Sequence, residues 1–272
     1  EVTPGDIAVG VVIGRSSEYF DFFVFGIAAA LIFPAIMFPF LPHFEATLWS
    51  FAIFALAFVA RPIGTITSMM LQRRFSISVK LTLALFTLGT ATAGIAFLPT
   101  YQAIGPAAIV LLALFRFAQG LGLGGSWDGL PSLLNLTAPP GRRGWYAMLG
   151  QLGAPVGFAL ASGLFAYLYI SLSQADFLSF GWRYPFFVSF AMNVVALFAR
   201  LRMVVSPEFQ EMMKERELQP ADVPDLVRNN SGTIVVGAFA ALASDALFHL
   251  VTIFPISWVT IHTNQPIGSF LI

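Results

Sequence analysis

The stretch RFAQGLGLGGSWDG, residues 116–129, decides what kind of chain this is, because two interpretations fit its glycines. Gly120, Gly122 and Gly125 satisfy the pattern G-x-G-x-x-G, which in dinucleotide-binding folds forms a turn around a pyrophosphate. The same glycines lie in an apolar run that also carries an arginine and an aspartate, as a functional helix inside a membrane would. The rest of the chain separates the two interpretations.

The overall composition is that of a membrane protein. Of the 272 residues, 57% are hydrophobic and 10% are charged, and the mean hydropathy is +0.81. Soluble domains carry about 25% charged residues. The formal net charge of zero argues against a nucleic-acid-binding face. Cysteine is absent, the histidines are scattered and no nucleophile–base pair is apparent, so we expect no metal, no cofactor and no enzymatic activity.

Seven apolar segments are each long enough to cross a bilayer core of about 30 Å as a helix. They run at residues 8–33, 48–71, 79–99, 105–136, 145–172, 185–205 and 232–260. We predict an N-terminal six-helix transmembrane bundle at 1–205, a cytoplasmic linker at 206–231 and the start of a second bundle at 232–272. The chain begins without Met, and too few residues follow the seventh segment for another crossing. We therefore expect a fragment whose second half is cut off.

Lys and Arg residues predict the orientation of the bundle. The loops after the second, fourth and sixth segments hold nearly all of the loop cations, whereas the opposite loops hold Arg183 alone. Cationic loops of membrane proteins face the cytoplasm. The pattern therefore predicts a cytoplasmic N-terminus.

The glycines of the opening stretch fit a membrane helix and not a nucleotide site. A dinucleotide-binding loop needs a strand before it and an acidic residue about 20 positions further on, but residues 105–115 are one apolar run and no such acidic residue follows. On a helix, small residues four positions apart let a neighbouring backbone approach closely. The predicted packing residues here are Gly120, Gly124, Gly125 and Gly129. Segment 145–172 offers a matching small face at Gly153 and Gly157, with Pro155 expected to kink it.

Ionisable residues inside the predicted spans carry the functional signal, because each costs about 2.5–3.5 kcal/mol at the bilayer centre on insertion scales. Glu18 and Asp21 lie three residues apart on the first segment, and Arg116 lies on the fourth. A rise of about 1.5 Å per residue places Asp21 and Arg116 near the midplane, where we expect them to pair. One interpretation is a proton-coupling site, since protonation of the carboxylate frees the arginine for an anionic substrate. The other is a structural ion pair that fixes two helices together.

Two further pairs of ionisable residues carry a weaker signal. Asp245 and His249 lie four residues apart on the seventh segment, where they either take part in function or face water or a polar neighbour. Arg15 and Arg61 lie near inner helix ends, where we expect their side chains to extend toward the lipid headgroups.

Six ordered motifs resemble one transporter family. They are EYFDF at 18–22, ARPIG at 60–64, the opening stretch, PPGRRG at 139–144, QLGAPVG at 151–157 and GWRYPFF at 181–187. In this order they resemble the metabolite:proton symporters of the major facilitator superfamily, which include dicarboxylate, shikimate and proline-betaine transporters. The resemblance implies an all-α membrane fold of two six-helix bundles that works by alternating access. This chain would supply the first bundle and the first helix of an incomplete second bundle.

The resemblance also implies which residues act. Glu18 and Asp21 occupy the family's acidic positions on the first helix, and Arg116 and Gln119 occupy its R-x-x-Q-G motif. In related transporters a carboxylate on the first helix and an arginine on the fourth carry proton coupling. The predicted proton-coupling residues are Asp21, Glu18 and Arg116, and the substrate-binding candidates are Arg116, Gln119, Gln151, Asp245 and His249.

The chain departs from the family pattern at two places. The family's G-G-E-W-G-G has Ser126 in place of its glutamate, and Asp128 appears two positions later. The superfamily loop G-x-x-x-D-R-x-G-R-K keeps the arginine at Arg74 but has Arg73 in place of the aspartate. That aspartate belongs to a charge network that steadies one state of the transporter. These changes put gating in question.

Two functions of different classes therefore compete. The first is a proton-coupled symporter of a small organic acid or osmolyte, monomeric if full-length, whose partners are protons, its small-molecule substrate and the lipid bilayer of a bacterial inner (plasma) membrane. The second is a truncated, degenerate transporter without transport activity, which persists as a membrane interaction partner or a pseudogene product. No nucleic-acid partner is expected.

Overall fold

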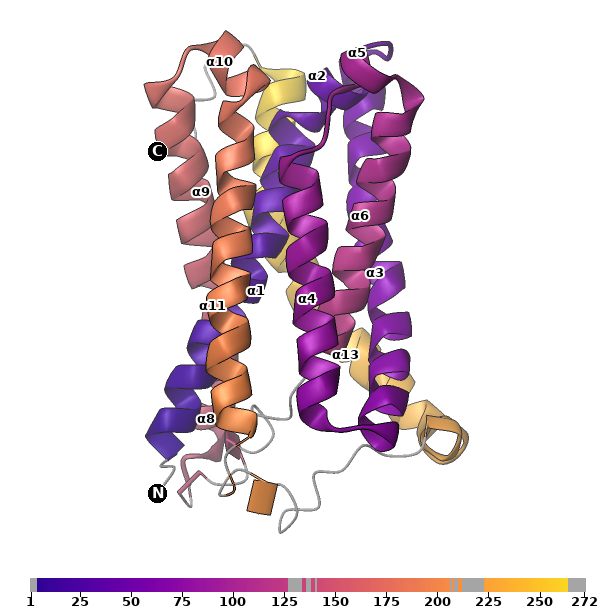
Figure 1. Ribbon diagram of the computed structural model, residues 1–272, viewed down its shortest axis with the longest axis vertical. Coiled ribbons are helices and arrows are strands. Elements are labelled where there is room, and N and C mark those ends of the chain that lie inside the picture. Colours follow the sequence, from indigo (N-terminus) through magenta and orange to yellow (C-terminus); the bar gives the residue numbers. More distant parts are fainter. Residues whose placement is uncertain are drawn as a thin grey trace.

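The protein, described by a computed structural model, is a bundle of long helices that lie side by side (Figure 1). The structure describes residues 4–126, 134–135, 138–139, 141–205, 207, 210–211 and 223–263. No strand occurs among these residues, and the predicted all-α membrane fold is confirmed. The first helix begins at one end of the bundle and the last helix ends at the other (Figure 1).

Long helices alternate with short ones at the ends of the bundle. In chain order the elements are α1 (Pro4–Leu31), α2 (Phe33–Met37), α3 (His43–Arg74), α4 (Ile77–Ala96), α5 (Tyr101–Ile104), α6 (Pro106–Gly125), α8 (Arg143–Leu149), η1 (Gly150–Leu152), α9 (Gly153–Ser171), α10 (Gln174–Ser179), η2 (Gly181–Arg183), α11 (Tyr184–Val204) and α13 (Val223–His262).

Six helical segments of the described chain are long and apolar enough to cross a membrane, by length and composition alone. They are His43–Arg74, Ile77–Ala96, Pro106–Gly125, Arg143–Ser171, Gly181–Arg202 and Pro224–His262. The remaining segment of the seven predicted is α1, which has 28 residues and runs along the bundle among the others (Figure 1). Any stretch of α1 long enough to cross carries the charges of Arg15, Glu18 and Asp21. This helix therefore needs a protein environment around its charged side.

That environment exists because α1 is the central helix. It packs against α3, α9, α11 and α13, and its residues 20–30 are all buried. A helix that is apolar on every side is stable where other helices cover each side. This central position takes Glu18 and Asp21 into the interior, where they are 6% and 1% exposed.

Glycines on two faces of α6 hold that helix between α3 and α4. A Cβ atom on Gly120 would lie 2.6 Å from the carbonyl oxygen of Ala57 on α3. A Cβ atom on Gly122 would lie 2.7 Å from the carbonyl oxygen of Ala84 on α4. Both contacts are too close for a side chain, so the glycines permit the backbone approach. The same crowding is found at Gly124 toward α3 and at Gly125 toward α4.

The small face of α9 meets α1 rather than the glycines of α6. A Cβ atom on Gly157 would lie 2.7 Å from the backbone nitrogen of Phe20, and one on Gly153 would lie 2.7 Å from the carbonyl carbon of Arg15. The two glycine-rich helices therefore do not pack on each other through these faces. Gly129, the remaining predicted packing residue, lies outside the described residues.

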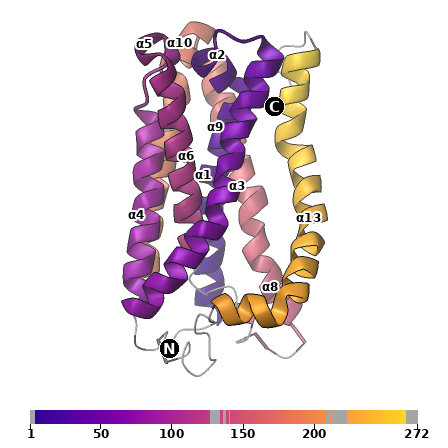
Figure 2. The same ribbon diagram turned by 90° about the vertical axis from the view of Figure 1, so that its right-hand side faces the viewer.

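The regular helices are interrupted at two places, one just before Pro155 and one at Asn230. The turn η1 (Gly150–Leu152) separates α8 from α9 and contains Gln151, four residues before Pro155. Pro155 has no N–H to donate to the carbonyl group of Gln151, which accounts for the interruption. In α13, Asn230 has non-helical angles (φ −129°, ψ 20°), and the chain before it lies across the end of the bundle (Figure 2). This first part of α13 falls within the segment 206–231 that the sequence assigns to a linker.

Arg183, the cation that the sequence places at the opposite end from the others, caps α4. Its Nη1 atom donates to the carbonyl oxygens of Ala96 and Leu98, each at 2.8 Å, and its guanidinium group lies 4.5 Å from the ring of Trp182. The last carbonyl groups of a helix have no partner within the helix. Its role as a helix cap therefore explains why this one arginine lies at the end of the bundle opposite to the other loop cations.

Candidate functional site

Asp21 lies where α1, α4, α6 and α11 meet, and it accepts hydrogen bonds from four side chains on the other three helices. Thr92 on α4 donates to Asp21 Oδ1 at 2.7 Å, and Ser189 on α11 donates to the same atom at 2.5 Å. Asn193, one turn further along α11, donates at 3.4 Å, and Gln119 on α6 donates to Asp21 Oδ2 at 3.2 Å. All five side chains are buried. We call these five residues the Asp21 cluster.

Arg116 does not form the direct ion pair with Asp21 that the sequence predicts. Gln119 lies between them: Arg116 Nη1 donates to Gln119 Oε1 at 3.0 Å, and Gln119 Nε2 donates to Asp21 Oδ2 at 3.2 Å. The physical reason is the helical register, because residues 116 and 119 lie on one face of α6 and the amide reaches the carboxylate first. The side chain of Gln119 also donates to Thr92 at 2.8 Å. A neutral amide thus connects the two charged groups.

The rest of the Arg116 environment is aromatic. Its guanidinium carbon lies 4.2 Å from the ring of Phe25, 4.6 Å from that of Phe54 and 5.5 Å from that of Phe22. Its Nε atom donates to the carbonyl oxygen of Phe54 at 3.2 Å, while Nη2 has no hydrogen-bond partner among the described residues. Ring faces attract a cation. Arg116 is therefore held without a carboxylate in contact, and one of its donors remains available.

Glu18 has a different environment, although it lies only three residues before Asp21. Arg15 Nη1 lies 2.7 Å from Glu18 Oε2, and Arg200 Nη2 of α11 lies 2.8 Å from Glu18 Oε1. The hydroxyl of Ser126 donates to Glu18 Oε1 at 2.8 Å. Arg15 thus pairs with a carboxylate inside the bundle instead of extending toward the headgroups, because Glu18 is only 6% exposed and needs a cation as its partner.

The other predicted site residues lie away from the Asp21 cluster. Gln151 is exposed in the turn η1, and Asp245 is exposed on α13. His249 is half-buried, with its ring 5.6 Å from that of Phe22. Arg73 and Arg74 are exposed at the end of α3. Asp128 lies outside the described residues.

Several members of the site were not predicted from the sequence. Thr92, Ser189 and Asn193 were not expected as partners of Asp21, and Arg200 was expected in a loop, although it is 7% exposed. A signal was present for two of them: Ser189 and Asn193 lie four residues apart in an otherwise apolar helix, and so share a face. Within the described ranges, no group of three or more His, Asp or Glu side chains is arranged to hold a metal ion.

Apolar membrane-spanning helices around a buried network of carboxylate, amide and guanidinium groups define a polytopic transport protein of the major facilitator type. The chain belongs to the sugar (and other) transporter family, whose model matches residues 7–239. Members of this family are transporters and not enzymes. The family assignment made from the six sequence motifs is confirmed.

Individual relatives agree with this assignment. The chain is 39% identical over 262 residues to the inner membrane metabolite transport protein YhjE of Escherichia coli (strain K12), a match that covers 96% of this chain and 59% of that protein. It is 30% identical over 266 residues to the shikimate transporter of the same strain, covering 97% and 61%. The crystal structure of a D-xylose-proton symporter shares the fold with a TM-score of 0.69 at 18% identity, covering 97% of this chain and 64% of that one. The chain therefore spans about three fifths of the length of these relatives.

Proposed function

We propose that the protein takes part in the transport of a small organic acid or osmolyte together with a proton, by alternating access, and that Asp21 is the proton acceptor. The observation that carries this proposal is the connection from Asp21 through Gln119 to Arg116. A buried carboxylate that is held by hydroxyl and amide groups, with no cation in contact, gains or loses a proton without breaking an ion pair. The relatives include a shikimate transporter and a proline/betaine transporter, which supports a small metabolite as the substrate.

The hydrogen-bond polarity of the cluster supplies a mechanism. The ionised Asp21 only accepts, and all four of its partners donate to it. A protonated Asp21 has an O–H that needs an acceptor, and rotation of the Gln119 amide would present its oxygen. The same rotation turns the Gln119 NH₂ group toward Arg116, which has only donors. Protonation of Asp21 would thus release Arg116 from Gln119 and leave its guanidinium group for an anionic substrate.

We also propose that the end of the bundle at which α1 begins faces the cytoplasm. The exposed cations Arg73, Arg143 and Arg202 all lie at that end, where α3, α8 and α11 meet the loops (Figure 1). The chain has no cysteine, so a single introduced cysteine is a specific label. An impermeant maleimide applied to intact cells should label Gln174→Cys and spare Arg143→Cys. Labelling of Arg143→Cys alone would reverse the orientation.

The alternative, a degenerate chain without transport activity, is not favoured. The motif residues Asp21, Gln119 and Arg116 form a connected network in which every hydrogen bond has suitable geometry. A chain that no longer binds protons or substrate has no need to keep three buried polar groups, each costly in an apolar interior.

Substitution of Asp21 tests the proposed role. In proteoliposomes with an imposed proton gradient, Asp21→Asn should abolish proton-driven accumulation but retain exchange of substrate down its own gradient. Asp225→Asn, which removes an exposed carboxylate at the start of α13, is the matched control and should behave as the unmodified protein. Full uphill uptake by Asp21→Asn would exclude Asp21 as the proton carrier.

A further inference from the structure

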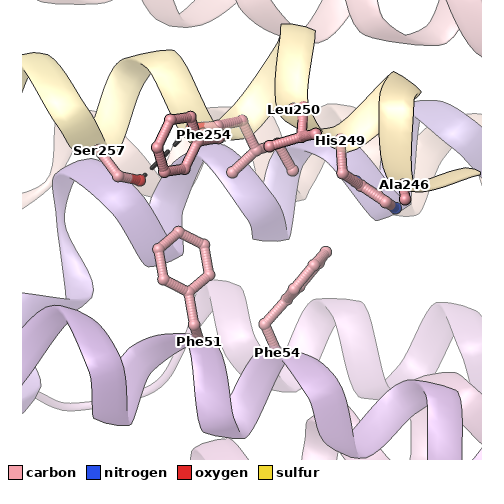
Figure 3. Close-up of a pocket in the computed structure, with 8 residues that line it drawn as sticks. Phe51, Phe54, Ala246, His249, Leu250, Phe254 and Ser257 are labelled. Atoms are coloured by element: carbon pink, nitrogen blue, oxygen red, sulfur yellow. Dashed lines mark hydrogen bonds between the residues drawn. The ribbon is translucent and has the colours of Figure 1, made fainter.

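A cavity of about 380 Å³ lies between α3 and α13, apart from the Asp21 cluster (Figure 3). Its wall is almost entirely apolar: the lining residues are Phe51, Phe54, Ala246, His249, Leu250, Ile253, Phe254 and Ser257. Cavities of about 300–1,000 Å³ with apolar walls and a few polar groups are typical of small-molecule sites. The volume is suited to a small ligand.

His249 is the polar side chain that remains available to a ligand in this cavity. The hydroxyl of Ser257 already donates to the carbonyl oxygen of Ile253. The imidazole of His249, by contrast, has no hydrogen-bond partner among the described residues, and its ring lies between aromatic neighbours, 5.6 Å from that of Phe22 and 6.2 Å from that of Phe58. A half-buried imidazole N–H without a partner favours a ligand that accepts a hydrogen bond.

The charges around the cavity favour an anion. Arg116 lies directly behind the wall, with its guanidinium carbon 4.6 Å from the ring of Phe54. Arg61 and Arg116 both lie over the ring of Phe22, at 6.0 Å and 5.5 Å. The acidic group on the same part of α13 is Asp245, one turn before His249, and it is exposed. Aromatic walls otherwise suit quaternary ammonium ligands, but Arg116 behind Phe54, with Arg61 beyond it on the ring of Phe22, disfavours a cation.

We propose that this cavity binds a carboxylate with an apolar body, such as an aromatic monocarboxylate. The apolar body packs against Phe51, Phe54 and Phe254, and the carboxylate accepts a hydrogen bond from His249. Phe54 separates the bound ligand from the unpartnered Nη2 atom of Arg116. A change in the Phe54 side chain would let the carboxylate reach Arg116. The proposal rests on the proposed transport function, for which it names the substrate class.

Equilibrium binding to the purified protein in detergent, without a proton gradient, tests the cavity separately from transport. The probes are radiolabelled benzoate, its neutral isostere benzamide, shikimate and glycine betaine. Benzoate should bind more tightly than the other three. Tighter binding of glycine betaine would show that the aromatic wall selects a quaternary ammonium group, and tighter binding of shikimate would show that the cavity selects hydroxylated acids; either result overturns the proposal.

Filling the cavity provides the first variant. Ala246 is exposed on α13 and lines the cavity, so Ala246→Phe occupies the space without displacing a buried group. A misfit of methylene size in an apolar pocket changes discrimination by about 10–200-fold, so the affinity for benzoate should fall at least 10-fold. Ala240→Phe, exposed on the same helix but outside the cavity, should leave the affinity within about 2-fold, the scale of a neutral surface substitution. Equal affinities in the two variants would overturn the assignment.

His249→Phe provides the second variant, because it keeps the aromatic contacts and removes the N–H donor. The affinity for benzoate should fall about 10–100-fold, the scale of a hydrogen bond to a charged group, while that for benzamide, whose neutral carbonyl oxygen makes a weaker hydrogen bond, should fall clearly less. A purely structural role for His249 would weaken both ligands equally. Asp21→Asn should lose proton-driven accumulation and retain benzoate binding. Full uphill uptake by Asp21→Asn with benzoate binding intact would reject only the proton-carrying role of Asp21. Proton-coupled transport by the unmodified protein without benzoate binding would reject only the cavity.

Discussion

Replacement of Gln119 by leucine tests whether this amide connects proton binding at Asp21 to Arg116. Gln119 is fully buried and makes three hydrogen bonds, to Asp21, Arg116 and Thr92. Leucine keeps most of the volume but removes the donor to Asp21 and the acceptor for Arg116. The guanidinium group then keeps a single hydrogen bond, from Nε to the carbonyl oxygen of Phe54.

The expected loss of stability follows from those three bonds. Hydrogen bonds inside membrane proteins contribute about 0.6 kcal/mol each on average, and those to charged groups contribute about 1.5–3 kcal/mol. Two of the three bonds of Gln119 join charged groups. The free energy of unfolding should therefore fall by about 2–6 kcal/mol, with the upper values applying if Arg116 finds no water.

The functional consequence is measured as the number of protons taken up per substrate molecule in proteoliposomes. Gln119→Leu should lower this ratio while substrate exchange continues. Asp21 can still bind a proton in this variant, but no amide rotation then releases Arg116. Gln102→Leu, in which an exposed glutamine of α5 is replaced, is the matched control and should change neither stability nor stoichiometry. If Gln119→Leu keeps the full ratio, the amide is a structural spacer and Asp21 acts on Arg116 by another route.

Three further substitutions address the ion pairs, the helix packing and the helix cap. Glu18→Gln should destabilise the protein by about 3–5 kcal/mol, as removal of one partner of a buried pair does, and should keep proton-driven uptake; loss of uptake at unchanged stability would make Glu18 the proton carrier. The exposed Glu45→Gln is its control. Gly120→Leu should prevent folding, seen as aggregation in size-exclusion chromatography, whereas Gly163→Leu, at a position with open space, should give a monodisperse peak. Arg183→Met removes the donor to the carbonyl groups of Ala96 and Leu98 at the end of α4 and should lower the free energy of unfolding by about 1–3 kcal/mol in thermal unfolding; an unchanged melting temperature would show that water replaces the cap.

The sequence predicted the helices and that Asp21 and Arg116 lie at one level of the bundle, but not the hydrogen bonds between them. The spacing of Arg116 and Gln119 places both on one face of a helix, and the depth argument brings Asp21 to the same level. Whether the guanidinium or the amide reaches the carboxylate depends on the rotation of α6 about its axis. That rotation is set by the contacts of Gly120 and Gly122 with two neighbouring helices, which no local pattern specifies.

The partners supplied by α4 and α11 were hidden for a related reason. Hydroxyl side chains within a helix commonly donate to the carbonyl group four residues earlier, and Thr92 does so with Leu88 at 2.9 Å in addition to its bond with Asp21. An isolated Thr or Ser in an apolar segment therefore does not reveal an interior site. Arg200 was assigned to a loop because it lies near a predicted helix end, yet α11 continues to Val204 and carries it into the bundle.

The different surroundings of Glu18 and Asp21 assign different roles to two carboxylates on one helix. Two guanidinium groups lie within 2.8 Å of Glu18, so a proton on Glu18 would break two ion pairs and leave two cations in an apolar interior. A proton on Asp21 breaks none, because its partners are hydroxyl and amide groups that can reverse the direction of their hydrogen bonds. Titratable groups whose environments differ in this way separate into a fixed charge and a group that exchanges protons. We therefore expect Glu18 to stay ionised and to hold α1 against α11 throughout the transport cycle. Asp21 should gain and lose a proton within each cycle.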